Sequence, residues 1–278
     1  MTKSIRRSIA GALACLAALP VFAQAPAEVS LTRFDCAAGG APPADIGRFS
    51  DTMAYDGKKQ QLTASCYLVR HADHYMIWDT GYPSAVAGTT PSSPTVKITL
   101  VEQLAQLKIK PEQIDYVGIS HYHGDHTGQA ASFPQATLLI GQGDWDVLKG
   151  PTPSGRTNAA PLEHWLSGEG KAEPVAKDKD VFGDGTVMML DMPGHTPGHH
   201  ALLVKLKDKG AVLLTGDQAH FRENYESNGV PTFNFNRADT LASFDRFKQI
   251  AKNLNATVII QHDPRDIDKL PAFPAAAK

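Results

Sequence analysis

The feature that most constrains this chain is the stretch at positions 121–126, which reads HYHGDH and holds four metal-binding side chains. It directly follows residues 116–120, a short and mostly apolar run typical of a β-strand. Residues i and i+2 of an extended backbone point the same way, so His121 and His123 can share one metal ion. Imidazole and carboxylate together suit Zn²⁺ and similar divalent metals. We therefore expect a metal site in the loop after this strand, with Asp125 and His126 available to a second ion.

Three other apolar runs also end in residues of the ligand type. Residues 188–192 lead into a loop with two prolines and two glycines that holds His195. Residues 211–215 lead to Asp217, and residues 257–261 lead to His262. Enzymes built on sheets assemble their sites where strand ends meet, so these side chains are predicted to converge with the first cluster.

The order of these motifs resembles the metallo-β-lactamase superfamily over nearly the whole chain after residue 23. Asp79-Thr80-Gly81, which follows the apolar run 75–78, resembles the first motif of that superfamily. The resemblance implies a four-layer αββα sandwich in a single domain. Periodicity alone supports only an α/β fold.

The resemblance also implies two divalent metal ions per chain, expected to be zinc. Each ion would have three ligands of its own, and Asp217 would bridge the two ions. The first set would be His121, His123 and His195, and the second set would be Asp125, His126 and His262.

Within the superfamily, the sequence most resembles N-acyl homoserine lactone lactonases, which quench quorum sensing. The segments that carry this likeness are residues 65–69, 193–199 and 213–224, together with the pair 262–263. The likeness implies a hydrolase in which a metal-bridging hydroxide opens the lactone ring. Asp125 or Asp217 would carry the proton to the departing ring oxygen.

His220 departs from that pattern, because many such enzymes have a tyrosine three residues after the bridging aspartate. A histidine can also donate a hydrogen bond to a carbonyl oxygen, although its reach is shorter. We therefore count His220 as a catalytic candidate. The alternative is that His220 only lines the pocket or supports a metal ligand.

Other functions stay open on the same residues. An organophosphate triester or a β-lactam could be the substrate, although β-lactamases generally carry Cys or Ser where this chain has Asp217. A mononuclear-iron sulfur oxygenase would use mainly the first ligand set and leave the second empty. A metal-binding protein without catalysis is a further class. The number of metal ions per chain separates the hydrolase from the oxygenase.

The first 23 residues have the pattern of a cleaved signal peptide. A basic start with Lys3, Arg6 and Arg7 precedes an apolar stretch at 9–19 that is too short to cross a bilayer. A small residue, Ala23, then precedes Gln24. We expect export to the periplasm or the exterior, and a mature hydrolase domain at 24–278.

Charge and cysteine content narrow the partners and the compartment. Loss of residues 1–23, with three basic and no acidic side chains, changes the net charge from −2 to −5. An acidic protein is a poor ligand for nucleic acid or an anionic membrane, so a small-molecule lactone is the expected partner. A homodimer remains open. The remaining cysteines, Cys36 and Cys66, could form a disulfide in an oxidising compartment or could be buried core thiols.

Hydrophobic spacing and turn residues predict the other elements. Apolar residues at helical spacing predict helices at 99–107 and 239–254, and a shorter helix at 143–148. Strands are expected at 29–34, 64–70 and 75–79. Loops rich in Gly, Pro and Ser are expected at 37–45, 82–94 and 150–161, the second of them bordering the pocket.

Overall fold

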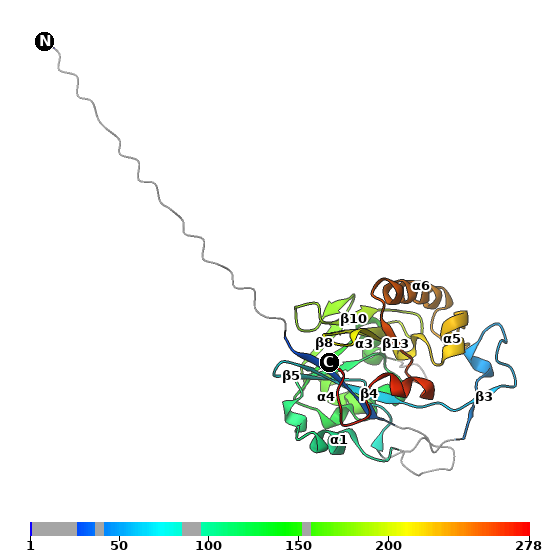
Figure 1. Cartoon of the computed structure of the whole chain (residues 1–278), viewed down its shortest axis with the longest axis horizontal. Helices are drawn as coiled ribbons and strands as arrows, with labels where there is room; N and C mark the ends of the chain where they lie inside the picture. The colour runs from blue at the N-terminus through cyan, green and yellow to red at the C-terminus, as the bar shows by residue number, and fades with distance from the viewer. Residues whose placement is uncertain (2–26, 37–41, 85–95, 152–156) are drawn as a thin grey trace.

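The computed structural model describes Met1 and residues 27–36, 42–84, 96–151 and 157–278 of the chain (Figure 1). The expected signal peptide at 1–23 and its cleavage point lie outside the described residues, Met1 excepted. Parts of the three expected loops lie outside them as well. No helix in the described part of the chain is both long enough and apolar enough to span a membrane.

The first of two large sheets has six strands in the order β1-β4-β5-β6-β7-β8. Its first three strands pair antiparallel, and its last four pair parallel. The strands are β1 (Val29–Asp35), β4 (Ser65–His71), β5 (His74–Trp78), β6 (Tyr116–Ile119), β7 (Thr137–Gly141) and β8 (Ala172–Val175).

The second large sheet has five strands in the order β13-β12-β11-β10-β9. It is antiparallel except for the parallel pair β12 and β13. The strands are β9 (Lys179–Asp180), β10 (Val187–Asp191), β11 (His200–Leu206), β12 (Gly210–Leu214) and β13 (Thr257–Ile259), and a small ribbon pairs β2 (Ala44–Asp45) with β3 (Lys59–Gln60).

Helices cover the outer faces of both sheets. Those described are α1 (Leu100–Gln106), α2 (Gly124–Thr127), α3 (Gln142–Lys149), α4 (Glu163–Leu166), α5 (Arg222–Ser227) and α6 (Arg237–Asn253). The ends of α1 and α6 follow from local chemistry. Thr99 and Glu102 form a capping box at α1, and the Asn236 side chain accepts from the Asp239 N–H at α6.

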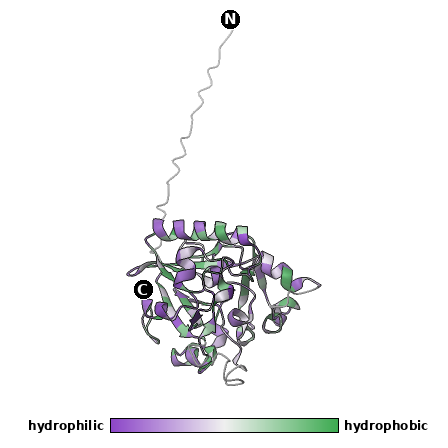
Figure 2. Ribbon diagram, turned by 90° about the vertical axis from the view of Figure 1, so that its right-hand side faces the viewer, coloured by the Kyte–Doolittle hydropathy of each residue, from purple (hydrophilic) through white to green (hydrophobic). Residues whose placement is uncertain are grey.

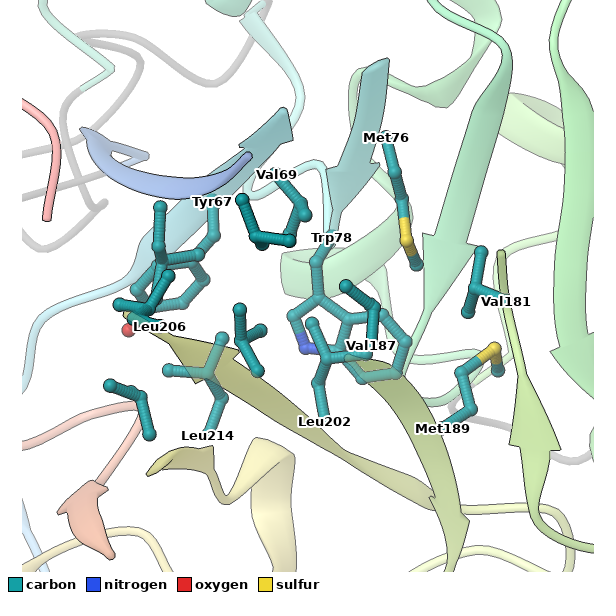
Figure 3. Close-up of a cluster of buried hydrophobic side chains, with 14 of the residues drawn as sticks. Tyr67, Val69, Met76, Trp78, Val181, Val187, Met189, Leu202, Leu206 and Leu214 are labelled. Atoms are coloured by element: carbon teal, nitrogen blue, oxygen red, sulfur yellow. The ribbon is translucent and has the colours of Figure 1, made fainter. Parts of the chain in front are cut away.

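Alternating side chains divide each strand between two cores. On β4, Tyr67 and Val69 point to the second sheet, where they meet Leu202 of β11 and Leu214 of β12 (Figure 3). Leu68, between them, points instead to the helices. Successive side chains of a strand point to opposite faces of the sheet, so a strand buried on both faces needs apolar residues at neighbouring positions.

The same alternation packs helices on the outside of each sheet. Leu100 and Leu104 of α1 lie in the core on the outer face of the first sheet. Phe247 of α6 packs on Leu203 and Leu213 of the second sheet. Hydrophilic residues run along the outside of α6 (Figure 2). The layers are thus helix, sheet, sheet and helix, which confirms the expected αββα sandwich.

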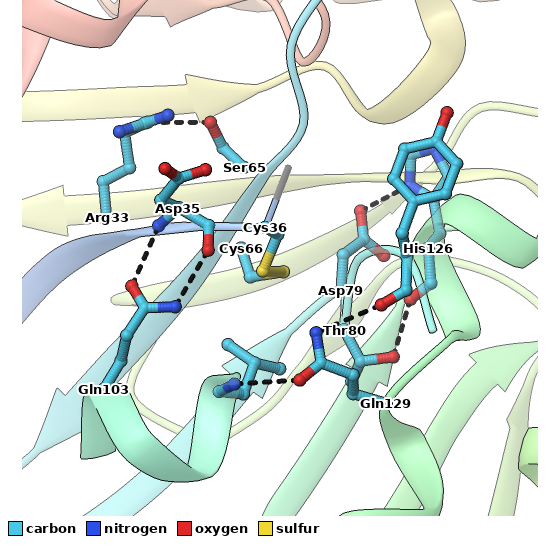
Figure 4. The surroundings of a disulfide bond; sticks show 12 residues. Arg33, Asp35, Cys36, Ser65, Cys66, Asp79, Thr80, Gln103, His126 and Gln129 are labelled. Atoms are coloured by element: carbon cyan, nitrogen blue, oxygen red, sulfur yellow. Dashed lines mark hydrogen bonds and ion pairs between the residues drawn. A yellow bond between two sulfur atoms is a disulfide. The ribbon is translucent and has the colours of Figure 1, made fainter. Parts of the chain in front are cut away.

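Of the two alternatives left open for Cys36 and Cys66, the disulfide is present, and both residues are fully buried. It joins the end of β1 to β4, with Gln103 of α1 bonded to the backbone of Asp35 beside it (Figure 4). The alternative of two separate core thiols was therefore wrong. The bond adds a covalent link to a hydrogen-bonded strand pair.

Candidate metal centre

The first predicted ligand set comes together as a triangle of imidazole nitrogens. His121 Nε2 lies 2.8 Å from His123 Nδ1 and 3.2 Å from His195 Nε2. His123 Nδ1 lies 3.0 Å from His195 Nε2. Two of these residues follow β6 and the third follows β10, so the two sheets each contribute to one group. With Asp217, they form one of the two metal-binding groups in the described residues.

The second predicted ligand set forms the other group. His126 Nε2 lies 3.8 Å from Asp125 Oδ2, and His262 Nε2 lies 3.7 Å from the same oxygen. His126 is fully buried, and His262 is 6% exposed. The Asp125 side chain is 24% exposed, and His123 of the first group is also partly exposed, so each group has one ligand that reaches toward solvent.

Asp217 faces both groups, one carboxylate oxygen toward each. Its Oδ2 lies 3.2 Å from His195 Nε2 and 3.6 Å from His121 Nε2. Its Oδ1 lies 2.9 Å from His262 Nε2 and 3.3 Å from His126 Nε2. A carboxylate placed in this way can bind one ion with each oxygen, as expected for a bridging ligand.

Strand direction explains why these residues meet. β10, β12 and β13 run the same way in the second sheet, because β10 and β12 are each antiparallel to β11 and β13 is parallel to β12. Their carboxyl ends therefore share one edge, which carries His195, Asp217 and His262. Gly216 takes the left-handed conformation (φ +52°), and a Cβ there would lie 2.7 Å from His199 Nε2. The turn into Asp217 thus requires glycine.

Hydrogen bonds to the outer nitrogens orient four of the five rings. His126 Nδ1 donates to Asp79 Oδ2 at 2.9 Å (Figure 4). His262 Nδ1 donates to the Thr63 carbonyl at 2.7 Å. His195 Nδ1 donates to Asn234 Oδ1 at 2.9 Å, and His121 Nδ1 lies 3.1 Å from Ser120 Oγ. Such partners fix the tautomer that leaves a lone pair on the inner nitrogen.

The donor set fits divalent metal ions. Three inner nitrogens within 3.2 Å of one another cannot all be joined by hydrogen bonds, since each neutral ring has one N–H. A divalent ion held between the three nitrogens would account for the spacing, since zinc, for example, binds imidazole nitrogen at about 2.0–2.1 Å. In the second group, His126 Nε2 and Asp217 Oδ1 are buried without a hydrogen-bond partner. Burial also lowers the pKa of His123 to about 3, which keeps it in the neutral form that binds metal.

Asp79, Asn234 and His199 support the ligands. For His199 the sequence predicts such a role, ordering the His195 loop rather than binding metal, whereas Asp79 and Asn234 have no predicted role of this kind. Asp79 was recognised only as part of a motif, yet its carboxylate accepts from the Ser120 N–H and hydroxyl as well as from His126. His199 Nε2 accepts from the Asp217 N–H at 2.9 Å, and its Nδ1 bonds the Met192 carbonyl. A strand ending in Asp79 was a detectable signal, whereas Asn234 lies in a loop without one.

His220 lies against the bridging carboxylate. Its Nε2 is 3.2 Å from Asp217 Oδ2, and its ring packs edge-on against Phe49, 4.8 Å away between centroids. Burial lowers the pKa of His220 to about 4 despite the opposing effect of Asp217. The ring is therefore neutral at physiological pH and has a single N–H to donate.

Tyr82 borders the second group from the loop after β5. Burial raises its pKa, and the nearby carboxylates of Asp125 and Asp217 raise it further, so the phenol stays protonated. The expectation that the loop at 82–94 borders the pocket falls mostly on residues outside the described part of the chain and stays a prediction. Residues 85–95 lie outside the described part.

The chain is similar to known proteins over most of its length. The family model of the metallo-beta-lactamase superfamily matches residues 61–262. The N-acyl homoserine lactonase AttM of Rhizobium radiobacter is 32% identical over 191 residues, which cover 62% of this chain and 68% of that protein.

Solved structures agree in fold. One is an N-acyl homoserine lactone hydrolase with the product N-hexanoyl-L-homoserine bound at its catalytic metal center. It has a TM-score of 0.75 at 22% identity, covering 91% of this chain and 100% of its own. Another is AidC, a dizinc quorum-quenching lactonase, with a TM-score of 0.59 at 15% identity and 91% of each chain covered. The family match, the ligand geometry and the shared fold lead to one conclusion: this chain belongs to the metallo-beta-lactamase superfamily.

Proposed function

We propose that the chain is a dinuclear, zinc-dependent hydrolase that opens the lactone ring of N-acyl homoserine lactones. The observation that carries the proposal is the position of Asp217. Its two carboxylate oxygens lie 2.9–3.6 Å from histidine nitrogens of two complete ligand groups. Similarity to a lactonase at 32% identity supports the substrate class. The second ligand group is complete, which argues against a mononuclear-iron oxygenase.

The site residues suit hydrolysis of an ester-like bond. Two divalent ions held by these residues would supply Lewis acidity and would lower the pKa of water to about 7, so that a nucleophile is available at neutral pH. Burial acts to raise the pKa of Asp217, but the surrounding histidines hold it well below its ordinary value. Asp217 is thus ionised at neutral pH, as is Asp125, and an ionised carboxylate has a free oxygen lone pair for the proton of the attacking water. Either could pass that proton to the ring oxygen as it leaves.

An aromatic cluster beside the metal centre suits the acyl part of the substrate. Phe49 and Phe233 pack edge-on at 5.2 Å, and both contact His220. Phe49 also belongs to a buried apolar group with Ile46, Tyr55 and Phe221. This aromatic cluster lies next to the metal centre, where the substrate carbonyl would bind. An apolar surface at that place favours a substrate with an apolar tail. We expect medium or long acyl chains to be accepted.

A substrate panel tests this proposal. Mature protein with two zinc ions should hydrolyse N-acyl homoserine lactones faster than a phosphotriester or a β-lactam, with kcat/KM as the measure. Faster turnover of the phosphotriester, with no lactone opening, would replace the lactonase proposal by a phosphotriesterase.

We predict that His220→Ala lowers kcat more than it raises KM. The reason is that the single N–H of His220, which faces Asp217 Oδ2 at 3.2 Å in the free protein, would turn to the oxygen of the reacting carbonyl when Asp217 binds metal. Loss of one such donor costs about 10²–10³ in kcat elsewhere, and we expect about 10- to 100-fold here because metal also stabilises that charge. His220→Tyr should retain most of the activity. Steady-state kinetics at equal metal content check this, and unchanged kcat and KM in His220→Ala would remove the residue from the mechanism.

We also propose that the protein is exported and that cleavage occurs near Ala23, because residues 1–23 are basic, then apolar, then small. Mass spectrometry of the cell-envelope fraction should find a chain starting near Gln24. An intact chain starting at Met1 in the cytoplasm would contradict this.

A further inference from the structure

Asp144 is a buried carboxylate beside the metal centre that belongs to neither ligand group. It lies in the first turn of α3 and is fully buried. Its Oδ2 accepts from the Tyr122 N–H at 3.0 Å and from the Thr196 hydroxyl at 2.9 Å. Its Oδ1 accepts from the Gly198 N–H at 2.7 Å. A buried carboxylate is costly unless it is well bonded, and these three donors offset that cost.

The donors to Asp144 come from both loops that supply the first ligand group. Tyr122 lies between His121 and His123, in the loop after β6 of the first sheet. Thr196 and Gly198 follow His195, in the loop after β10 of the second sheet. One side chain therefore holds together two loops, one from each sheet.

The backbone fits closely at the same place. A Cβ on Gly141, just before α3, would lie 1.8 Å from the Gly198 carbonyl oxygen. A Cβ on Gly198 would lie 2.4 Å from the Asp144 N. The start of α3 and the His195 loop are thus in direct backbone contact, so the position of Asp144 relative to that loop is closely defined.

We propose that Asp144 is the positioning residue of the first metal group, setting the placement of His195 relative to His121 and His123. This inference rests on the proposed two-metal centre. It concerns how the site is assembled, and Asp144 itself would contact neither metal nor substrate.

The role uses the carboxylate form of the side chain, which the three donors favour while burial raises its pKa to about 7. Two oxygens accept from three donors that approach from two loops. An asparagine of the same shape has one oxygen and one NH₂ group, so at least one donor would face another donor. A loop would then move, and the first group would lose its geometry while the second keeps its own supports at Asp79 and Thr63.

The experiment compares Asp144→Asn with Asp180→Asn, each made in two backgrounds. Asp180 is a matched control, because its carboxylate also accepts two backbone N–H groups, from Gly183 and Gly185. His262→Ala weakens the second group and leaves the first to be measured, and His195→Ala does the reverse. Zn²⁺ affinity is measured for each protein by competition with a chromophoric chelator.

Asp144→Asn should weaken Zn²⁺ binding about 10- to 100-fold in the His262→Ala background. It should change binding less than about 3-fold in the His195→Ala background. Asp180→Asn should change neither. Equal weakening in both backgrounds, or none in either, would overturn the positioning role. A wild type that binds fewer than two ions would instead contradict the proposed function.

A milder pair of variants keeps the test valid if Asp144→Asn does not fold. Thr196→Val removes one donor at nearly constant volume and should weaken the first group about 5-fold, whereas Thr196→Ser keeps the hydroxyl and should restore binding. Equal affinity in these two variants would count against the inference.

Discussion

Asp217→Ala is expected to cost the protein both metal ions and to lower kcat/KM for lactone hydrolysis by ~10³-fold or more. Its two oxygens each face one ligand group, so one substitution removes a ligand from both. It also leaves an uncompensated cluster of buried histidines. Elemental analysis after gel filtration should find well under one ion per chain.

Two further variants make the result specific to bridging. His262→Ala removes a ligand from the second group alone and should retain about one ion. Asp208→Ala removes an exposed carboxylate and should retain two ions and full activity. Two tightly held ions in Asp217→Ala would show that Asp217 does not bridge them.

Replacing both cysteines, as in Cys36→Ala with Cys66→Ala, should lower the free energy of unfolding by about 3–4 kcal/mol. The bond closes a loop between residues 30 positions apart, which restricts the unfolded chain. In a protein of this size the melting temperature should fall by roughly 10 °C. Urea unfolding, followed by circular dichroism at equal zinc content, measures the change.

The Cys→Ala variants lose packing of the sulfur atoms as well as the covalent bond. Unfolding the wild-type protein with and without a reductant separates these two effects. Reduction alone should produce most of the loss, because the thiols still fill the core. The zinc content of the double variant should stay near two ions, since neither cysteine is a ligand. A free-energy change below about 1 kcal/mol would show that the disulfide contributes little to folding.

The sequence predicts the metal ligands well because each follows the end of an apolar strand. Strand ends are marked by local signals, namely an apolar run followed by Gly, Pro or a ligand residue. His195 and Asp217 are 74 and 96 positions from His121, yet all three lie in one group, with His195 and Asp217 following strands that run the same way in the second sheet. The bridging role of Asp217 was predicted from the family resemblance alone. The position of its two oxygens, one toward each ligand group, agrees with that role.

The supporting residues could not be predicted in the same way. Asp144 contacts Gly198, which is 54 positions away, and Asn234 contacts His195, which is 39 positions away. No local pattern marks a polar side chain whose partner lies in another layer. β7 was missed for a different reason: its apolar run is followed by Gln and Gly rather than by a ligand residue, which was the signal that marked the other runs. The sequence could not decide between a disulfide and two free thiols, because spacing along the chain does not give the distance between two cysteines in the fold.

The most direct test of the two-metal lactonase is a zinc titration of the metal-free mature protein, with ring opening of a medium-chain N-acyl homoserine lactone measured at each step. Because the site needs both ligand groups, activity should stay low until the second equivalent binds and should level off at two ions per chain. Full activity at one ion per chain, or no ring opening with two ions bound, would contradict the account.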